Sequence, residues 1–480
     1  MRVAYLVPFL SPLVRALAPP QSYVNTAIAR TVDLGGATTH LTTQYNIKAT
    51  ANSPGEYWLA LAGEDDEEPA WWEVTVGGKV VEGRIVASEK APTVAVPLGE
   101  LKKGDAVTLS LTSLLTHTSS PLPETIEQRD AQYLLWRSNS TYVDSWYTSD
   151  VERIKLRAPT PNILSYSNVP SVYTRDSTTT KSASTVTLGP FHSVPPTLGG
   201  DSQVEQPPFQ IHYEANAPII QMRTLRRLAE VSHWGGNLNI QDEVELFNMG
   251  PKLKGHFSRL AHQQSKFHAS TPPQILTDLT FRLPPLAHTP YFYDTIGNVS
   301  TSHFRPGSTP ASKGKFKSPR VVDSVLELRP RYPLLGGWNY SYTVGWDMPL
   351  EEALKGGADG KKVLAVPFML GNRDMIADHV ELNIILPEGA RDVEVFTPFR
   401  VDSIEHSSHS TYLDSTGRHA ITLKKARCTE NHAVNVYVTY TYPLSAQLQK
   451  PFMVSAVVGG LFILAMGLRR IDIGIEKKRK

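Results

Sequence analysis

The sequence holds a single cysteine, Cys428, among 480 residues. One thiol cannot close an internal disulfide, so the chain must be stabilised by its own hydrophobic cores and by partner proteins. The same scarcity excludes a zinc site built from cysteines. We therefore expect Cys428 to be a packed small residue and not a reactive thiol.

Catalytic motifs are also missing. The sequence has no H-E-x-x-H, no G-x-S-x-G, no phosphate-binding loop and no dinucleotide-binding glycine pattern. His406 and His409 are spaced like metal ligands, but serines surround them, and we interpret the segment as a loop between strands. The carboxylates of Asp242, Glu243 and Glu245 are interpreted as the charged face of a strand. We expect no catalytic residue, no cofactor and no metal site.

Long apolar segments are scarce, and the longest runs from Pro451 to Leu468 without a charge. Lys450 precedes it, and Arg469 and Arg470 follow it. As a helix it would be about 27 Å long, close to the hydrocarbon thickness of an endoplasmic reticulum membrane. A buried core helix is the alternative, but the run lacks amphipathic polarity. The sequence therefore predicts a transmembrane helix over residues 451–468.

Two overlapping pairs of small residues lie in this run, Ser455 with Gly459 and Ala456 with Gly460. Small side chains four residues apart let a neighbouring helix approach closely in a membrane. Glycine is common in membrane helices, so an incidental spacing is the alternative. We expect this face to pack against another membrane helix.

The N-terminus is typical of a cleaved signal peptide over residues 1–18. Arg2 is followed by the apolar stretch Val3–Val14 and then by Ala16-Leu17-Ala18. An uncleaved anchor is the alternative, but two prolines and an arginine within the segment disfavour a membrane helix. A signal peptide together with a C-terminal span predicts a single-pass type I protein with its bulk in the lumen.

The predicted cytosolic tail, residues 469–480, ends in a basic cluster. Its Lys477 and Lys478 resemble a dilysine signal for retrieval to the endoplasmic reticulum. A plain positive-inside cluster is the alternative, and it places the tail on the same side of the membrane.

Three glycosylation sequons precede the span, at Asn139, Asn298 and Asn339. Each asparagine is followed two residues later by serine or threonine, which is the acceptor pattern for N-glycosylation. Their position before the span agrees with a luminal body, and we expect at least one of them to carry a glycan.

Alternating side chains indicate strands through most of the chain. Val434–Tyr442 and Val380–Leu386 alternate apolar and polar residues, as in an antiparallel sheet with one buried face. Trp72–Val76 and Lys79–Val81 flank Gly77-Gly78, which predicts a hairpin. The predicted fold class is mainly β, with two tandem luminal antiparallel β-sandwich-like domains plus one C-terminal transmembrane helix.

The predicted luminal part has about 430 residues, which is longer than one typical domain, so we expect it to contain more than one. The segment Leu188–Pro218 is rich in proline and polar residues and is predicted to mark the boundary. We predict β-domain 1 over residues 19–218 and β-domain 2 over residues 219–445. The basic segment Thr301–Arg320 is predicted to be a long surface loop. The formal net charge of +2 gives no indication of nucleic-acid binding.

The segment His233–Asn237 (HWGGN) interrupts a strand pattern with two glycines. Glycines at such a place permit positive φ or a close backbone approach. Trp234 then either fills the seam between the two domains or is displayed for a partner. We favour the seam, because tryptophan is mostly buried in proteins.

Three longer stretches resemble the ribophorin I family: Glu230–Asn237 (EVSHWGGN), Tyr293–Ser302 (YDTIGNVSTS) and Arg329–Trp338 (RPRYPLLGGW). The signal peptide and the single span fit as well, so the resemblance covers essentially the whole chain. The short tail resembles the fungal form of the family. The resemblance implies a subunit of the oligosaccharyltransferase complex, which transfers a preassembled oligosaccharide from dolichyl diphosphate to asparagine in nascent chains.

The resemblance further implies an accessory role, because catalysis in this complex belongs to a separate polytopic subunit with a bound divalent cation. It implies β-rich domains similar to the non-catalytic N-terminal domain of zinc aminopeptidases. Trp71-Trp72-Glu73 is only superficially similar to the tryptophan-tryptophan-aspartate motif of the catalytic subunit, and we expect it in a strand.

The implied partners are the catalytic and other subunits of oligosaccharyltransferase, the endoplasmic reticulum membrane, nascent polypeptides and the translocon. The expected function is to stabilise the complex and to present acceptor polypeptides. Two alternatives remain open from the residues alone: a luminal hydrolase or peptidase, which the missing motifs disfavour, and a type I receptor for glycoprotein cargo.

Overall fold

The computed structural model describes residues 19–470 apart from short gaps at 53, 62–67, 87, 89, 170–171, 175–178, 199–203, 269, 310–320, 358–359, 372–373 and 412–413. The predicted signal peptide, and the tail lysines Lys477 and Lys478, lie outside the described residues. The described chain is mainly β and ends in one long apolar helix.

Residues 19–218, called here the N-terminal unit, form three sheets around one core. The eight-stranded sheet contains, in spatial order, β14 (Thr179–Ser182), β15 (Thr185–Val194), β12 (Ser149–Arg157), β1 (Tyr23–Leu34), β2 (Thr38–Ala49), β8 (Ala106–Thr116), β4 (Trp71–Val76) and β5 (Lys79–Val80). The smaller sheets are β13 (Ile163–Tyr166), β16 (Phe209–Ala215), β11 (Gln132–Ser138) and β9 (Ser119–Pro121), and β3 (Glu56–Ala60), β7 (Thr93–Pro97) and β6 (Arg84–Val86).

Residues 219–445, called the C-terminal unit, are built in the same way around a second core. The seven-stranded sheet contains β21 (His288–Asp294), β24 (Asn339–Pro349), β18 (Asn237–Asn248), β17 (Ile220–Ser232), β27 (Ile376–Ile385), β30 (Arg418–Cys428) and β29 (Ser403–His409). The smaller sheets are β20 (Leu279–Leu283), β23 (Ser324–Leu328) and β22 (His303–Arg305), and β25 (Leu354–Gly356), β26 (Lys361–Pro367), β31 (Asn435–Thr441) and β28 (Arg391–Phe396).

The two large sheets repeat one topology. In each, a long hairpin (β1–β2 or β17–β18) is flanked by a strand that pairs in parallel with its first arm (β12 or β27). The bulge in the hairpin also recurs, between Asn25 and Ala27 in one unit and between Met222 and Thr224 in the other. The sheets are therefore mixed, whereas the alternating patterns predicted only antiparallel pairing.

Strands with a strict period of two were predicted correctly. In β31 the side chains of Val436, Val438 and Tyr440 are fully buried, as their alternation predicts. The hairpin over β4 and β5 is confirmed, and both Gly77 and Gly78 have positive φ.

The segments predicted as a domain boundary and as a long surface loop both contain strands. The predicted boundary segment Leu188–Pro218 includes most of β15 and all of β16, which belong to the N-terminal unit. The predicted loop Thr301–Arg320 includes the short strand β22, which pairs with β23; its residues 310–320 lie outside the described residues.

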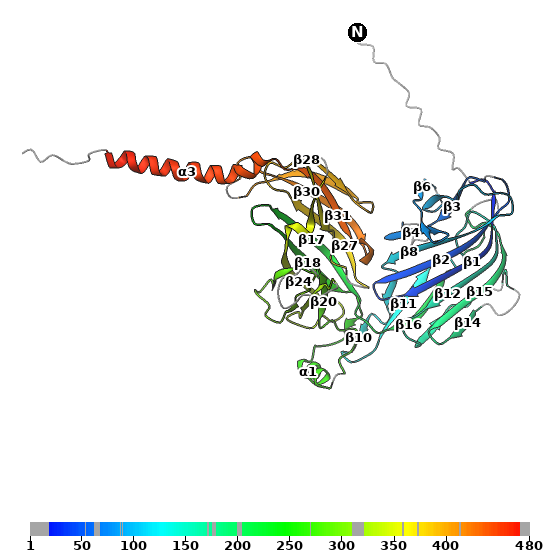
Figure 1. The fold of residues 1–480 in the computed structure, drawn as a ribbon. Coiled ribbons are helices and arrows are strands. Elements are labelled where there is room, and N and C mark those ends of the chain that lie inside the picture. The colour runs from blue at the N-terminus through cyan, green and yellow to red at the C-terminus, as the bar shows by residue number, and fades with distance from the viewer. Residues whose placement is uncertain are drawn as a thin grey trace, which may run out of the picture.

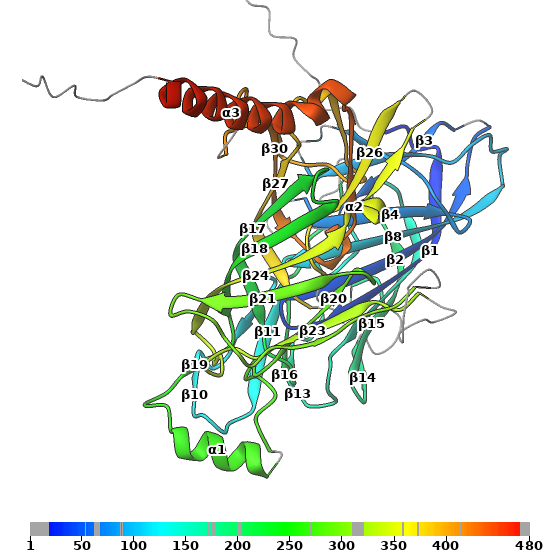
Figure 2. The ribbon, with the colours of Figure 1, turned by 60° about the vertical axis from the view of Figure 1, so that its left-hand side comes forward.

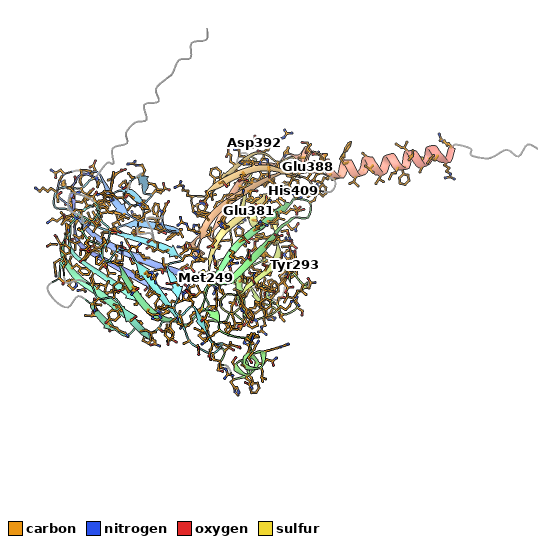
Figure 3. All side chains as sticks on the ribbon, turned by 180° about the vertical axis from the view of Figure 1, so that it is seen from behind. Met249, Tyr293, Glu381, Glu388, Asp392 and His409 are labelled. Atoms are coloured by element: carbon orange, nitrogen blue, oxygen red, sulfur yellow. The ribbon has the colours of Figure 1, made fainter. Side chains whose placement is uncertain are left out.

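Direct contacts join the two units, which lie side by side in Figure 1. The short strands β10 (Thr125–Ile126) and β19 (Lys252–Leu253) pair in parallel across the junction. His117 Nε2 lies 2.8 Å from Asp378 Oδ1. Ile376 of β27 is packed into the core of the N-terminal unit. Met249 lies at this junction in Figure 3.

Helices are few within the described residues. They are α1 (Arg259–Phe267), the single turns α2 (Leu350–Ala353) and η1 (Glu430–His432), and α3 (Leu444–Arg470). Figure 2 shows α1 beyond β10 and β19, at the end of the C-terminal unit opposite α3. The 27-residue α3 has no buried residue and is long and apolar enough to cross a membrane.

Candidate functional site

The histidine and carboxylate candidates do not assemble into a metal or catalytic centre. No group of three or more histidine, cysteine, aspartate or glutamate side chains within the described ranges could hold a metal ion. His406 Nδ1 lies 3.0 Å from His419 Nε2, and no third ligand joins them. The segment from His406 to His409 was predicted as a loop, but it lies in the exposed strand β29.

Asp242 was predicted on a charged strand face and is instead buried. Both of its carboxylate oxygens accept hydrogen bonds of 2.6 Å, from Nε and Nη2 of Arg227. The third nitrogen of Arg227, Nη1, donates to the carbonyl oxygen of Pro367. Glu243 points to solvent, as the prediction required. This ion pair is structural, because its two side chains satisfy one another inside the core.

Cys428 is buried, as the sequence predicts. Burial raises the pKa of its thiol to about 12, so the nucleophilic thiolate does not form near neutral pH.

All three sequon asparagines are exposed. Asn139 follows β11, Asn339 begins β24, and Asn298 lies in the turn after β21. The turn before Asn298 is held firmly, because Asp294 accepts two hydrogen bonds from Arg331 and two from backbone amides within the turn. These hydrogen bonds, led by those of Arg331, hold the pKa of Asp294 well below its usual range. The structure thus brings together two of the stretches that resemble ribophorin I.

A cavity of about 470 Å³ lies between the two larger sheets of the N-terminal unit. Its size falls in the range of small-molecule pockets. The loop from Ser138 to Thr141, including Asn139, forms part of its lining, together with Arg30 and Asp144. The rest of the lining combines polar side chains with aliphatic and aromatic ones, the latter being Val32, Leu41, Leu115, Trp136, Ile154, Leu156, Leu188 and Phe209.

The turn between β17 and β18 contacts the root of α3. The indole Nε1 of Trp234 donates a 2.9 Å hydrogen bond to the carbonyl oxygen of Gln447. His233 Nε2 lies 2.8 Å from the hydroxyl of Tyr440, and its ring stacks on Tyr442 with centroids 4.5 Å apart. Gly236 has φ of 62°, which explains the glycine in this turn.

Trp234 is 61% exposed, so the prediction that it fills the seam between the domains is wrong. The turn lies at the end of the C-terminal unit from which α3 leaves, away from the N-terminal unit (Figure 1). The prediction failed because exposure depends on the neighbours of the turn, which the local sequence does not determine.

A second loop holds the same helix turn from another side. Lys450 Nζ lies 2.6 Å from Asp414 Oδ1, and Gln449 Nε2 donates to Ser415 Oγ at 2.6 Å. Burial disfavours the charge of Asp414, but the donors around it, Lys450 first, hold its pKa well below the usual range. Glu388, which anchors this loop, lies beside the root of α3 in Figure 3.

These contacts of the two loops with the start of α3 were not predicted from the sequence. The short link between the end of β31 and Lys450 could have indicated them, because it keeps the start of the helix close to the sheet. The small residues Ser455, Ala456, Gly459 and Gly460 lie further along α3 and are not buried within the chain. A Cβ atom added at Gly459 or Gly460 would meet no atom within 4 Å, so this face is free for a neighbour.

The architecture defines a class: a mainly β membrane protein, built as two related units on one C-terminal helix. The family model of ribophorin I matches residues 23–469, and the chain belongs to the ribophorin I family.

Curated relatives agree with this assignment. The chain is 29% identical over 458 residues to "Dolichyl-diphosphooligosaccharide--protein glycosyltransferase subunit 1" of Caenorhabditis elegans, covering 94% of this chain and 72% of the relative. It is 30% identical to subunit 1B of the same name from Oryza sativa subsp. japonica, covering 78% of this chain and 73% of the relative.

Solved structures add little. A native yeast LTA4 hydrolase is similar over 46% of this chain and 34% of its own, at 12% identity and a TM-score of 0.27. An M1 zinc metallopeptidase from Deinococcus radiodurans gives a TM-score of 0.24 at 14% identity, over 45% of this chain and 49% of its own. Similarities of this size do not define a shared fold.

Proposed function

We propose that this chain is a non-catalytic subunit of the oligosaccharyltransferase complex, which N-glycosylates nascent proteins in the endoplasmic reticulum. The observation that carries the proposal is the family match over residues 23–469, which spans both β-units and nearly all of α3. The relatives are named as subunit 1 of this glycosyltransferase. A hydrolase or a cargo receptor is not favoured by these relationships.

An accessory role is supported by the chemistry of the described side chains. The histidine pair at His406 lacks a third ligand, Asp242 is neutralised by Arg227, and Cys428 is buried. A purified chain without its partners should therefore turn over neither peptide substrates nor lipid-linked oligosaccharide. Turnover that disappears with a single histidine or carboxylate substitution would contradict the accessory role.

The proposed topology is type I, with both β-units in the lumen. The exposed sequons at Asn139, Asn298 and Asn339 would then face the glycosylating compartment. Arg469 and Arg470 would lie on the cytosolic side, in keeping with the positive-inside rule. Retrieval through Lys477 and Lys478 completes the proposed localisation in the endoplasmic reticulum.

The proposed division into two domains, at residues 218 and 219, is supported by the two hydrophobic cores, although Ile219 and Ile376 pack into the first of them. In the complex, we assign the small-residue face of α3 to contact with other subunits in the membrane, and the β-units to stabilisation of the assembly. Nascent polypeptides and the translocon are the remaining proposed partners.

The cavity of the N-terminal unit is the described surface best suited to a segment of acceptor polypeptide. Its walls suit an apolar side chain, and its polar rim, with Ser140 and Gln206, suits backbone groups. A photo-crosslinker at Gln206 should capture a nascent acceptor chain in the complex. The same crosslinker at the exposed Lys90, outside the cavity lining, is the control.

The experiment that tests the proposal is purification of the full chain from native membranes. A stoichiometric set of oligosaccharyltransferase subunits, and reduced glycosylation of acceptors when the chain is depleted, are the expected results. Cargo glycoproteins as the sole stable partners would instead support the receptor alternative and refute the subunit role.

A further inference from the structure

Trp234 is an exposed tryptophan with a specific hydrogen bond. Its turn is tightly built: Ser232 Oγ accepts from the amide of Gly235 at 3.0 Å, and the carbonyl of Gly236 accepts from the amide of Leu350 at 2.9 Å. The indole is therefore held in place by ordered backbone while most of its surface remains exposed. An ordered and exposed indole has an apolar ring and a polar N–H group, which suits it to a boundary between an apolar and an aqueous phase.

The acceptor of that hydrogen bond is unusual. In a helix the carbonyl of Gln447 would accept from the amide of residue 451, but residue 451 is proline and has no amide hydrogen. Pro451 thus leaves the Gln447 carbonyl without its helical donor. The indole of Trp234 supplies the missing hydrogen bond at 2.9 Å.

This contact lies at the edge of the predicted membrane. Pro451 begins the apolar run, and Gln447 precedes it by four residues, or about 6 Å along the helix axis. The interfacial layer of a bilayer is several ångströms deep and is where tryptophan concentrates. Leu444 and Leu448, on the same turns of α3, are 68% and 52% exposed, which extends the apolar surface around the indole.

Further contacts between α3 and the C-terminal unit hold the start of the helix rigidly. Lys450 is paired with Asp414, which in turn lies 3.2 Å from Arg418 Nε. Arg418 also forms an ion pair with Glu230 of β17, which lies three residues before His233. At Gly389 an added Cβ would lie only 2.6 Å from the Cβ of Ala446, so the sheet and the helix are in close contact.

We propose that the Ser232–Asn237 turn is an interfacial joint, in which Trp234 completes the helix at Pro451 and lies in the headgroup layer of the membrane. The partner of this face is the lipid surface. The joint fixes the C-terminal unit in one orientation on its span, so that the two β-units are held at a defined height above the bilayer.

The position of Trp234 in the membrane is tested by tryptophan fluorescence of the full chain in phosphatidylcholine nanodiscs, with and without brominated acyl chains. Because the sequence has 8 tryptophans, the signal of Trp234 is taken as the difference between wild type and Trp234→Phe. The exposed position predicts that Trp234→Phe folds normally. Bromolipids should quench this difference signal, because an indole at the interface lies next to the lipid. A difference signal that bromolipids leave unchanged would overturn the interfacial position.

The role of the hydrogen bond is tested by deuterium exchange of the segment from Leu444 to Phe452. Trp234→Phe should speed exchange there by about fivefold, the value of one ordinary hydrogen bond. In a Pro451→Ala background, which returns the missing donor, the same substitution should have a much smaller effect. An equal effect in both backgrounds, or none in either, would refute the role assigned to Pro451. Trp338→Phe, an indole change in the same unit at the end away from α3, is the matched control and should leave this segment unchanged.

Discussion

The ion pair between Arg227 and Asp242 makes a sharp prediction about the core of the C-terminal unit. The guanidinium is 0% exposed and the carboxylate 2%, so neither charge has access to water. Asp242→Asn removes the negative charge and turns an acceptor into a donor that faces the guanidinium. The expected cost is about 3–5 kcal/mol, the range for removing one partner of a buried pair.

The same magnitude follows from the individual contacts. One of the two charge-assisted hydrogen bonds of 2.6 Å is lost and the other is made to a neutral amide oxygen, where each such bond contributes about 1.5–3 kcal/mol and the amide donor left facing the guanidinium adds to the cost. In a unit of this size, 1 kcal/mol corresponds to about 2–4 °C in melting temperature. Asp242→Asn should therefore lower the melting temperature of the full chain in nanodiscs by about 6–20 °C.

Two further variants separate charge from packing. Glu243→Gln changes the adjacent, exposed carboxylate on the other face of β18 and should stay within about 0.5 kcal/mol of wild type. The double variant Arg227→Met with Asp242→Leu should recover most of the loss, because apolar side chains of similar volume replace buried pairs well. Recovery should be incomplete, since the carbonyl of Pro367 loses its donor.

The reasoning fails if Asp242→Asn lowers the melting temperature by less than about 2 °C, which is under 1 kcal/mol for a unit of this size. It also fails if the double variant is as unstable as the single one. The first result would mean that water reaches the pair, and the second that shape, not charge compensation, determines the cost.

Three other expectations follow from the structure. Burial raises the pKa of Glu152 from 4.5 to about 7, so the folded state retains a proton that the unfolded chain releases, and stability should fall as pH rises through this window. Glu152→Gln should abolish that slope and, at pH 7.5, stabilise the chain by about 1–3 kcal/mol in chemical denaturation. Replacing Gly459 and Gly460 with leucine should weaken co-purification of other subunits in detergent while leaving membrane insertion intact; undiminished recovery would exclude this helix face as an interface. Asn298→Gln should increase electrophoretic mobility by one glycan, and no change in mobility would show that this sequon is unoccupied.

The strands that sequence could predict are those whose burial alternates. In β27 and β31 one face packs on the core and the other faces water, so apolar and polar side chains alternate along the sequence. In β29 nearly every residue is exposed, so His406 and its neighbours carry no alternation that could reveal a strand. The parallel pairing of β17 with β27 was also invisible, because it joins segments far apart in the chain.

The burial of Asp242 could have been predicted from the alternation of residues in the sequence. The inward residues of β18 include Ile240 and Val244, and Asp242 lies between them in the same phase. Arg227 has the same relation to Leu225 and Ala229 in β17. In a long alternating strand, the position of a charged residue in the alternation therefore predicts its burial better than its charge predicts exposure, provided that the facing strand carries the opposite charge.

The repeated topology places an arginine at the same position in both units, but within the described residues only the second faces a carboxylate across the hairpin. Arg30 lies three residues after the bulge in β1, as Arg227 does in β17. The residue across the hairpin is Thr43 in the first unit and Asp242 in the second.

This single difference changes the surroundings of the arginine. Arg30 Nε bonds to Thr43 Oγ1 at 3.1 Å, and its Nη2 has no hydrogen-bond partner within the described chain. Arg30 also lines the cavity of the N-terminal unit, whereas Arg227 is closed in by its carboxylate. The arginine with a carboxylate partner therefore lies in the unit that contacts α3, and the arginine without one lies in the unit with the cavity of about 470 Å³.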